Sequence, residues 1–135
     1  MAIWGSGSPR REFLQVEDLA EACIFLMKTY SAPALVNIGS GEELSIKALA
    51  ELIARVVGYE GRLEFDRSKP DGTPRKLLDL TRLHELGWRH RIPLRDGIEA
   101  LYAWYRTHAP PAGESLLVAE GRPASRAGSY RPDRA

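Results

Sequence analysis

Short strand-like runs alternate with amphipathic helical patterns along this chain, and the alternation limits the folds that it can adopt. Apolar residues recur at spacings of three and four over residues 18–30 and again over residues 45–57, as they do on one face of a helix. Shorter apolar runs at 11–16, 35–38 and 62–65 have the length of strands. The pattern predicts an α/β fold that is mostly helical, with two or three short strands.

Local signals mark the ends of the predicted helices. Asp18 is expected to cap the first helix, and Ser45 to cap the second. Gly58 has the freedom to adopt the left-handed conformation that closes a helix. A short helix is expected around residues 81–86, and Pro93 is expected to open the last one.

Composition narrows the class of protein. The 135 residues suffice for one domain, and 44% apolar with 27% charged residues is the balance of a soluble globular chain. A net charge of +1 gives no field that attracts nucleic acid or anionic lipid, and no apolar run approaches the roughly 20 residues that span a bilayer. The single cysteine, Cys23, lies in a helical pattern and is expected to be buried. We expect a cytoplasmic protein with no secretory signal and no metal site.

The last 27 residues differ in composition from the rest. Residues 109–135 hold four prolines, three glycines and four arginines, with one short apolar run at 116–118. So little apolar surface cannot offset the entropy lost on ordering the segment. We expect residues 1–108 to fold and residues 109–135 to form a disordered, solvated tail rich in Pro, Gly and Arg.

Two glycine- and proline-containing segments carry the candidate chemistry. The first, W-G-S-G-S-P-R-R-E-F, starts at Trp4 and places a flat aromatic ring near Arg10 and Arg11. The second, K-P-D-G-T-P-R-K, forms a tight turn that presents Asp71 as an acceptor and Lys76 as a cation. Such cations suit a diphosphate, although spacing alone fits solvated surface turns equally well. A third segment, Gly39-Ser40-Gly41, has too little of a nucleotide-loop pattern to be more than a turn.

Together these segments resemble a known family. The string WGSGSPRREFLQVEDLA resembles the stretch that follows the last cofactor contacts in extended short-chain dehydrogenases. Its pairing with SKPDGTPRKLLD is similar to GDP-L-fucose synthases, which are GDP-4-keto-6-deoxymannose 3,5-epimerase/4-reductases. The similarity continues through LTRLHELGW and covers about residues 3–108. It implies the C-terminal, substrate-binding portion of a Rossmann-type fold.

The resemblance also implies a substrate and residues that contact it. The family uses NADP(H) to convert GDP-4-keto-6-deoxymannose to GDP-L-fucose, and a homodimer is expected for its full-length members. Positions that match its substrate contacts are Trp4, Arg11, Asp71 and Lys76. The implied roles are Arg11 and Lys76 on the diphosphate, Asp71 on ribose or base, and Trp4 on the sugar. Gln15 stands where the family usually has histidine, which predicts altered local hydrogen bonding.

Two motifs of the family's chemistry are not found in the sequence. The Gly-x-x-Gly-x-x-Gly turn that holds a cofactor pyrophosphate is absent, and none of the five tyrosines has a lysine four residues later. The chain alone is therefore expected to be inactive, with no catalytic residue of its own and with its apolar helix faces partly uncovered.

Three functions remain open at this point. The chain is the substrate-binding part of a fucose synthase, or a non-catalytic GDP-sugar module that pairs with a separately encoded cofactor domain, or an inactive remnant. The first two require Arg11 and Lys76 to lie on the same side of the fold.

Overall fold

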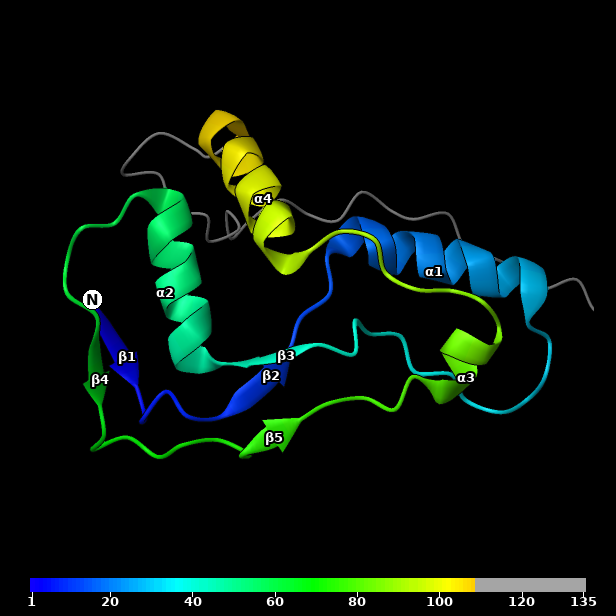
Figure 1. Cartoon of the computed structure of the whole chain (residues 1–135), viewed down its shortest axis with the longest axis horizontal. Helices are drawn as coiled ribbons and strands as arrows, with labels where there is room; N and C mark the ends of the chain where they lie inside the picture. The colour runs from blue at the N-terminus through cyan, green and yellow to red at the C-terminus, as the bar shows by residue number, and fades with distance from the viewer. Residues whose placement is uncertain (109–135) are drawn as a thin grey trace, which may run out of the picture.

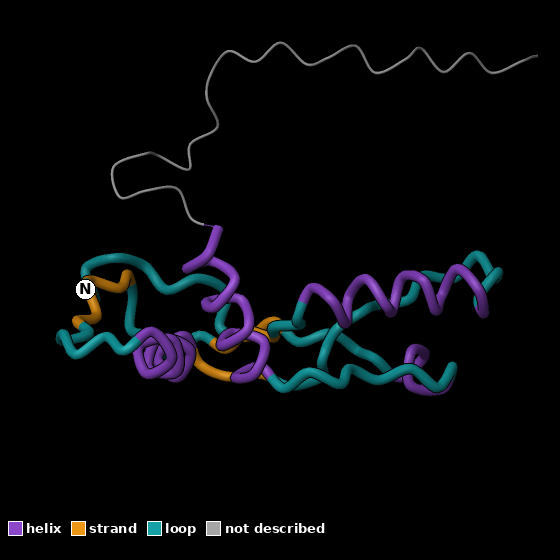
Figure 2. The backbone as a smooth tube through the Cα atoms, turned by 90° about the horizontal axis from the view of Figure 1, so that it is seen from above, coloured by secondary structure: helices purple, strands orange, loops and turns teal. Residues whose placement is uncertain are grey.

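The computed structural model describes residues 1–108 as a thin, elongated α/β arrangement (Figure 1). The elements, in chain order, are β1 (Ala2–Trp4), β2 (Arg10–Glu12), α1 (Val16–Thr29), β3 (Glu43–Ser45), α2 (Ile46–Val57), β4 (Glu64–Asp66), β5 (Arg75–Lys76), α3 (Thr81–Glu85) and α4 (Leu94–His108). Seen from above, α2 points along the line of sight while α1 follows the long axis (Figure 2). The α/β class with few short strands is confirmed, and the predicted tail at 109–135 lies outside the described residues.

The strands form two small sheets that bring distant segments together. β1 pairs with β4 in parallel, and the second sheet has the order β3-β2-β5. β2 is antiparallel to β3 and parallel to β5. Residues 2–12 therefore run in the same direction as residues 64–76, side by side (Figure 1). Between the paired strands, the Gly5 N–H donates to the Asp66 carbonyl at 2.9 Å and the Arg10 N–H to the Pro74 carbonyl at 2.8 Å.

Most of the helix signals act as expected. The Ser45 hydroxyl accepts from the Ala48 N–H at 3.1 Å, and Gly58 ends α2 with a φ of 71°. The predicted cap of α1 is wrong, because the helix starts earlier and the Gln15 side chain accepts from the Glu17 N–H. Asp18 instead lies within the first turn and is 2% exposed.

Asp18 connects two segments that are far apart in the sequence. Its carboxylate accepts from the Ile92 N–H at 2.9 Å and from the Arg91 N–H at 3.2 and 3.3 Å. These bonds fix the loop before α4 against the start of α1. Asp18 was predicted to cap a helix, but its carboxylate binds a distant segment of the chain. The sequence pattern alone does not indicate this contact.

The core is small and lies where α1, α3 and the loop after α3 meet. Its buried residues are Ala22, Leu83 and Trp88, and the half-buried side chains around it are Leu14, Phe25, Leu26, Val36 and Ile38. Much of α1 remains uncovered, since Ile24 is 53% and Met27 is 85% exposed. The prediction of partly uncovered helices is confirmed, whereas Cys23 is exposed and not buried as expected.

One predicted strand is absent, and three strands that were not predicted are present: β1, β3 and β5. Residues 35–38 are not a strand; Val36 and Ile38 pack against core residues of α1 and α3, which offer no backbone ladder. β3 and β5 were not expected, because each has only two or three residues and little apolar character. Both strands exist because they pair with β2.

No helix among residues 1–108 has the length and apolar character needed to cross a membrane. The same part of the chain contains no group of three or more His, Cys, Asp or Glu side chains placed to hold a metal ion.

Candidate functional site

The turn after β1 is built around two glycines that have to be glycine. Gly5 and Gly7 have φ values of 85° and 76°, in the left-handed region that side chains rarely adopt. A Cβ on Gly5 would lie 2.4 Å from Oδ1 of Asp71, and one on Gly7 would lie 2.5 Å from the Phe65 ring. The turn therefore approaches the second segment more closely than any other residue type allows.

Asp71 is held by that turn. Its Oδ1 accepts from the Ser6 N–H at 2.8 Å, and its Oδ2 accepts from the Ser6 hydroxyl at 2.7 Å. These hydrogen bonds, that from the hydroxyl first, lower the pKa of Asp71 below its ordinary value. Asp71 is thus a carboxylate at neutral pH and a structural link between the two segments.

Trp4 lies at the end of β1, beside the same loop. The residue is 74% exposed, and the Lys69 ammonium lies 5.5 Å from the centroid of its ring, a cation–π distance. The loop thus covers part of the aromatic surface and leaves most of it accessible. An exposed indole of this kind is a surface on which a flat or apolar ligand group can pack.

Arg11 and Lys76 occupy neighbouring strands. They are register partners in the β2–β5 pair, so their Cα atoms lie directly across from each other. One Arg11 Nη donates to the Arg10 carbonyl at 2.7 Å, and the other lies close to Gly72, where a Cβ would be 3.2 Å away. Within residues 1–108 neither cation has an acidic partner at ion-pair distance. The structure therefore places Arg11 and Lys76 next to each other, on the same side of the fold, as the sequence-based hypothesis of a diphosphate site requires.

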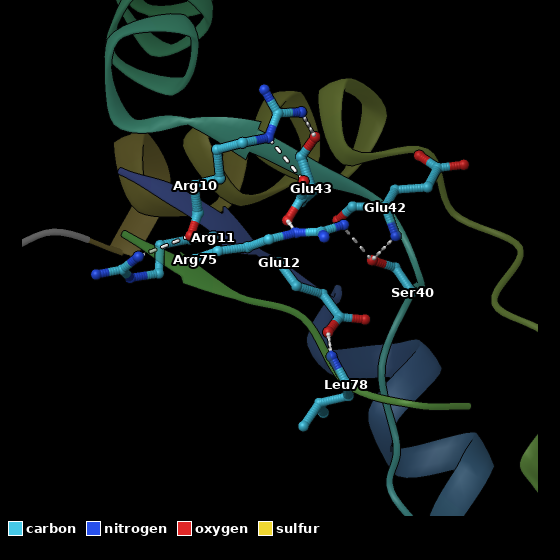
Figure 3. Close-up of polar contacts among 8 residues, drawn as sticks. All are labelled: Arg10, Arg11, Glu12, Ser40, Glu42, Glu43, Arg75 and Leu78. Carbon is cyan, nitrogen blue, oxygen red and sulfur yellow. Dashed lines mark hydrogen bonds and ion pairs between the residues drawn. The ribbon is translucent and has the colours of Figure 1, made fainter. Parts of the chain in front are cut away.

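The arginines next to them have a different environment. Arg10 Nε lies 2.7 Å from Oε1 of Glu43, and Arg75 Nε lies 2.8 Å from its Oε2. Figure 3 shows both guanidiniums reaching Glu43, while that of Arg11 points away from it. The Arg75 guanidinium above all, with that of Arg10, holds the pKa of Glu43 below its ordinary value of 4.5. Glu43 thus neutralises two of the cations in the motifs.

Glu12 ties this sheet to the segments on either side of it. Its carboxylate accepts from the Gly41 N–H at 2.6 Å. It also accepts from the Leu78 N–H at 3.0 Å (Figure 3). Gly39 makes room for it, since a Cβ there would lie 2.2 Å from Oε1 of Glu12. The Gly39-Ser40-Gly41 turn therefore serves to receive a carboxylate and leads into β3.

A cavity of about 140 Å³ lies beside Glu43. Its lining comprises Phe13, Leu14, Gln15, Ser40, Glu42, Glu43, Leu44, His90, Ile92 and Leu94. None of the four residues predicted from the sequence lines it. Trp4, Asp71 and Lys76 are exposed and Arg11 is half-buried, all along the paired segments.

The sequence reading missed Ser6, Glu12 and Glu43 as members of this region. Ser6 and Glu12 stand inside the first motif, where their hydroxyl and carboxylate were visible but their partners were not. Glu43 carries no local signal at all, because its two arginines are 33 and 32 residues away along the chain. Only strand pairing brings these groups into contact.

Comparison with known proteins identifies proteins that are similar to this chain. Residues 1–39 match the family described as the NAD dependent epimerase/dehydratase family. GDP-L-fucose synthase 1 of Arabidopsis thaliana is 56% identical over 105 residues, which cover 78% of this chain and 32% of that protein. GDP-L-fucose synthase of Escherichia coli (strain K12) is 50% identical over 114 residues, covering 78% and 36%. A GDP-L-fucose synthetase from Naegleria fowleri bound to NADP superimposes with a TM-score of 0.74 at 26% identity, covering 78% and 34%.

Residues 1–39 thus match the model of the NAD dependent epimerase/dehydratase family, and the described residues have the α/β architecture of part of such Rossmann-type enzymes. The sequence is similar to the GDP-L-fucose synthases. The chain spans about a third of the length of these relatives.

Proposed function

We propose that residues 1–108 form the nucleotide-sugar-binding part of an enzyme that converts GDP-4-keto-6-deoxy-D-mannose to GDP-L-fucose by 3,5-epimerisation and NADPH-dependent 4-reduction. The observation that carries the proposal is the placement of Arg11 and Lys76 as partners on adjacent strands, where neither forms an ion pair with a residue of 1–108. The identity of 50–56% to GDP-L-fucose synthases supports the choice of ligand.

The two cations suit a diphosphate. Paired strands lie about 4.8 Å apart, so side chains from register partners can reach both phosphates of one diphosphate. Each phosphate of a nucleotide-sugar diphosphate carries one negative charge, which two cations balance. Arg11 supplies a planar fork of N–H donors, and Lys76 supplies a mobile point charge. Both lie beside the 69–74 loop, so the ligand would run along the seam between the paired segments.

Trp4 and Asp71 would bind the other ends of the ligand. The exposed indole offers a wall for the sugar, whose C–H faces pack on aromatic rings. Each Asp71 oxygen accepts one hydrogen bond from Ser6 and retains a second lone pair, which can accept from a ribose hydroxyl or a base N–H. Asp71 thus acts as both a link in the protein and an acceptor for the ligand.

The described residues suit the substrate better than the cofactor. A pyrophosphate-binding turn runs from a strand into a helix N-terminus, whose N–H groups face the phosphates. Gly39-Ser40-Gly41 instead follows an irregular segment, leads into β3 and receives the Glu12 carboxylate. We therefore assign residues 1–108 to substrate binding and assign none of them a step in hydride transfer.

Titration calorimetry of the 135-residue chain with GDP-L-fucose tests the proposal. Arg11→Ala should weaken binding roughly 10- to 100-fold, the effect of losing a charge-assisted hydrogen bond to phosphate. Arg10→Ala is the matched control, because the Arg10 guanidinium is already paired with Glu43. This substitution should leave the affinity for GDP-L-fucose within about 2-fold of that of the unmodified chain. Absence of binding to the unmodified chain, or equal losses in both variants, would contradict the proposal. Circular dichroism of each variant confirms that it is folded.

A further inference from the structure

Ser6 makes every hydrogen bond that its hydroxyl can make. The hydroxyl oxygen donates its one proton to Oδ2 of Asp71 at 2.7 Å. Its two lone pairs accept from the Ser8 N–H at 3.1 Å and from the Ser8 hydroxyl at 2.7 Å. Because a hydroxyl has one donor and two acceptor sites, the Ser8 hydroxyl is the donor in that last pair. The direction of the bond from Ser6 to Asp71 is fixed because an ionised carboxylate can only accept a hydrogen bond.

Asp71 belongs to a loop that has little else to hold it. Every residue from 67 to 79 is exposed, so the loop gains almost nothing from apolar burial. Its ends are fixed by the β4 and β5 pairings, at Asp66 and at Pro74. Between those ends, within the described chain, the hydrogen bonds to the first segment are the two that Ser6 donates to Asp71.

The position of this loop sets the surroundings of two proposed ligand contacts. Lys69 lies over the ring of Trp4, and Gly72 lies against the guanidinium of Arg11. Movement of the loop at Asp71 would therefore change what covers the indole and what supports the Arg11 side chain. Gly5 permits the link, because a Cβ there would collide with Asp71 Oδ1 at 2.4 Å.

From these contacts we propose that Ser6 is a positioning residue of the nucleotide-sugar site, which holds the loop 69–74 in its binding position by fixing the carboxylate of Asp71. This inference rests on the proposed function for its ligand. Ser6 acts through Asp71 and not by touching the ligand. Because Ser6 acts only through Asp71, removing both residues should weaken binding no more than removing Asp71 alone.

A double-mutant cycle with a local probe of the loop tests this role. The variants are Ser6→Ala, Asp71→Ala and the double variant, with Ser8→Ala as the matched control, since that hydroxyl touches Ser6 and not Asp71. Ser6→Ala should weaken GDP-L-fucose binding about 3- to 10-fold, the net effect of one solvent-exposed hydrogen bond that acts on the ligand only through Asp71. The double variant should bind no more weakly than Asp71→Ala alone. Ser6→Thr, which keeps the hydroxyl, should restore most of the affinity.

Hydrogen exchange of the free protein separates this inference from the proposed function. Amides of residues 67–73 should exchange about 3- to 10-fold faster in Ser6→Ala, as expected for the loss of one solvent-exposed hydrogen bond, that from Ser6 to Asp71. The exchange rates of amides in α2 should not change. Unchanged loop exchange, or fully additive losses in the double variant, would overturn the role of Ser6. If the loop loosens but no form of the chain binds GDP-L-fucose, the proposed function fails and the inferred ligand role fails with it, while the link between Ser6 and the loop stands.

Discussion

Each face of the β3-β2-β5 sheet carries a pair of cationic side chains, and the two pairs differ in their acidic partners. On one face, Arg10 and Arg75 share the carboxylate of Glu43, whose side chain is 13% exposed. On the other, Arg11 and Lys76 have no acidic partner within residues 1–108. Successive side chains of a strand point to opposite faces, so neighbours in sequence are separated in space. The comparison indicates that one pair of cations holds the sheet together while the other remains available to a ligand.

After Arg11→Ala, the largest expected effect comes from comparing Lys76→Ala with Arg75→Ala. Loss of the Lys76 cation should weaken GDP-L-fucose binding about 10-fold, because one charge-assisted contact to phosphate disappears. Arg75→Ala removes a cation of equal charge that is already paired with Glu43. The affinity of this variant for GDP-L-fucose should therefore stay within about 2-fold of that of the unmodified chain. Titration calorimetry measures both. Equal losses would show that net charge, and not the face of the sheet, determines binding.

An intermediate effect is expected when the acid between the arginines is neutralised. Glu43→Gln leaves two guanidiniums next to each other without a counter-charge, and should lower the melting temperature by a few degrees. Binding of GDP-L-fucose should change little below the transition. Circular dichroism melts give the temperature. Glu42→Gln is the control, since the Glu42 side chain is exposed and its one charge partner among residues 1–108 is His90, at 3.9 Å. If the melting temperature of Glu43→Gln is unchanged, Glu43 does not stabilise the sheet through its ion pairs with Arg10 and Arg75.

The smallest effect is expected from acidification. Since the pKa of Glu43 is lower in the folded protein than its ordinary 4.5, the carboxylate contributes stability that is fully present above that value. This stability is lost as the pH falls through the folded-state pKa, so the melting temperature should decline below about pH 4.5. Glu43→Gln should make the decline shallower. A Glu43→Gln chain that loses stability as steeply as the unmodified one would show that other groups control the acid response.

Much of the helical structure could be predicted from the sequence because its signals are local. Ser45 caps α2 and Gly58 ends it at the expected positions. The pattern at 81–86 gave α3, and Pro93 precedes the first residue of α4. Such signals act within one or two turns of backbone, so they need no knowledge of the rest of the fold.

The same local reasoning failed where a strand or a cap depends on a distant partner. β5 has two residues and exists because β2 lies next to it, and the run at 35–38 is no strand because its neighbours are core side chains of α1 and α3. Asp18 looked like a cap but binds backbone N–H groups more than 70 residues away.

For the candidate site, the sequence by itself supplied the two glycine- and proline-rich segments and the residue types Trp4, Arg11, Asp71 and Lys76. Only the tertiary structure decided that Arg11 and Lys76 are neighbours and that Arg10 and Arg75 are bound to Glu43. The physical reason is that the charge available to a ligand depends on which cations already have an acidic partner. That pairing follows from the register of strands that are more than 30 residues apart in the chain.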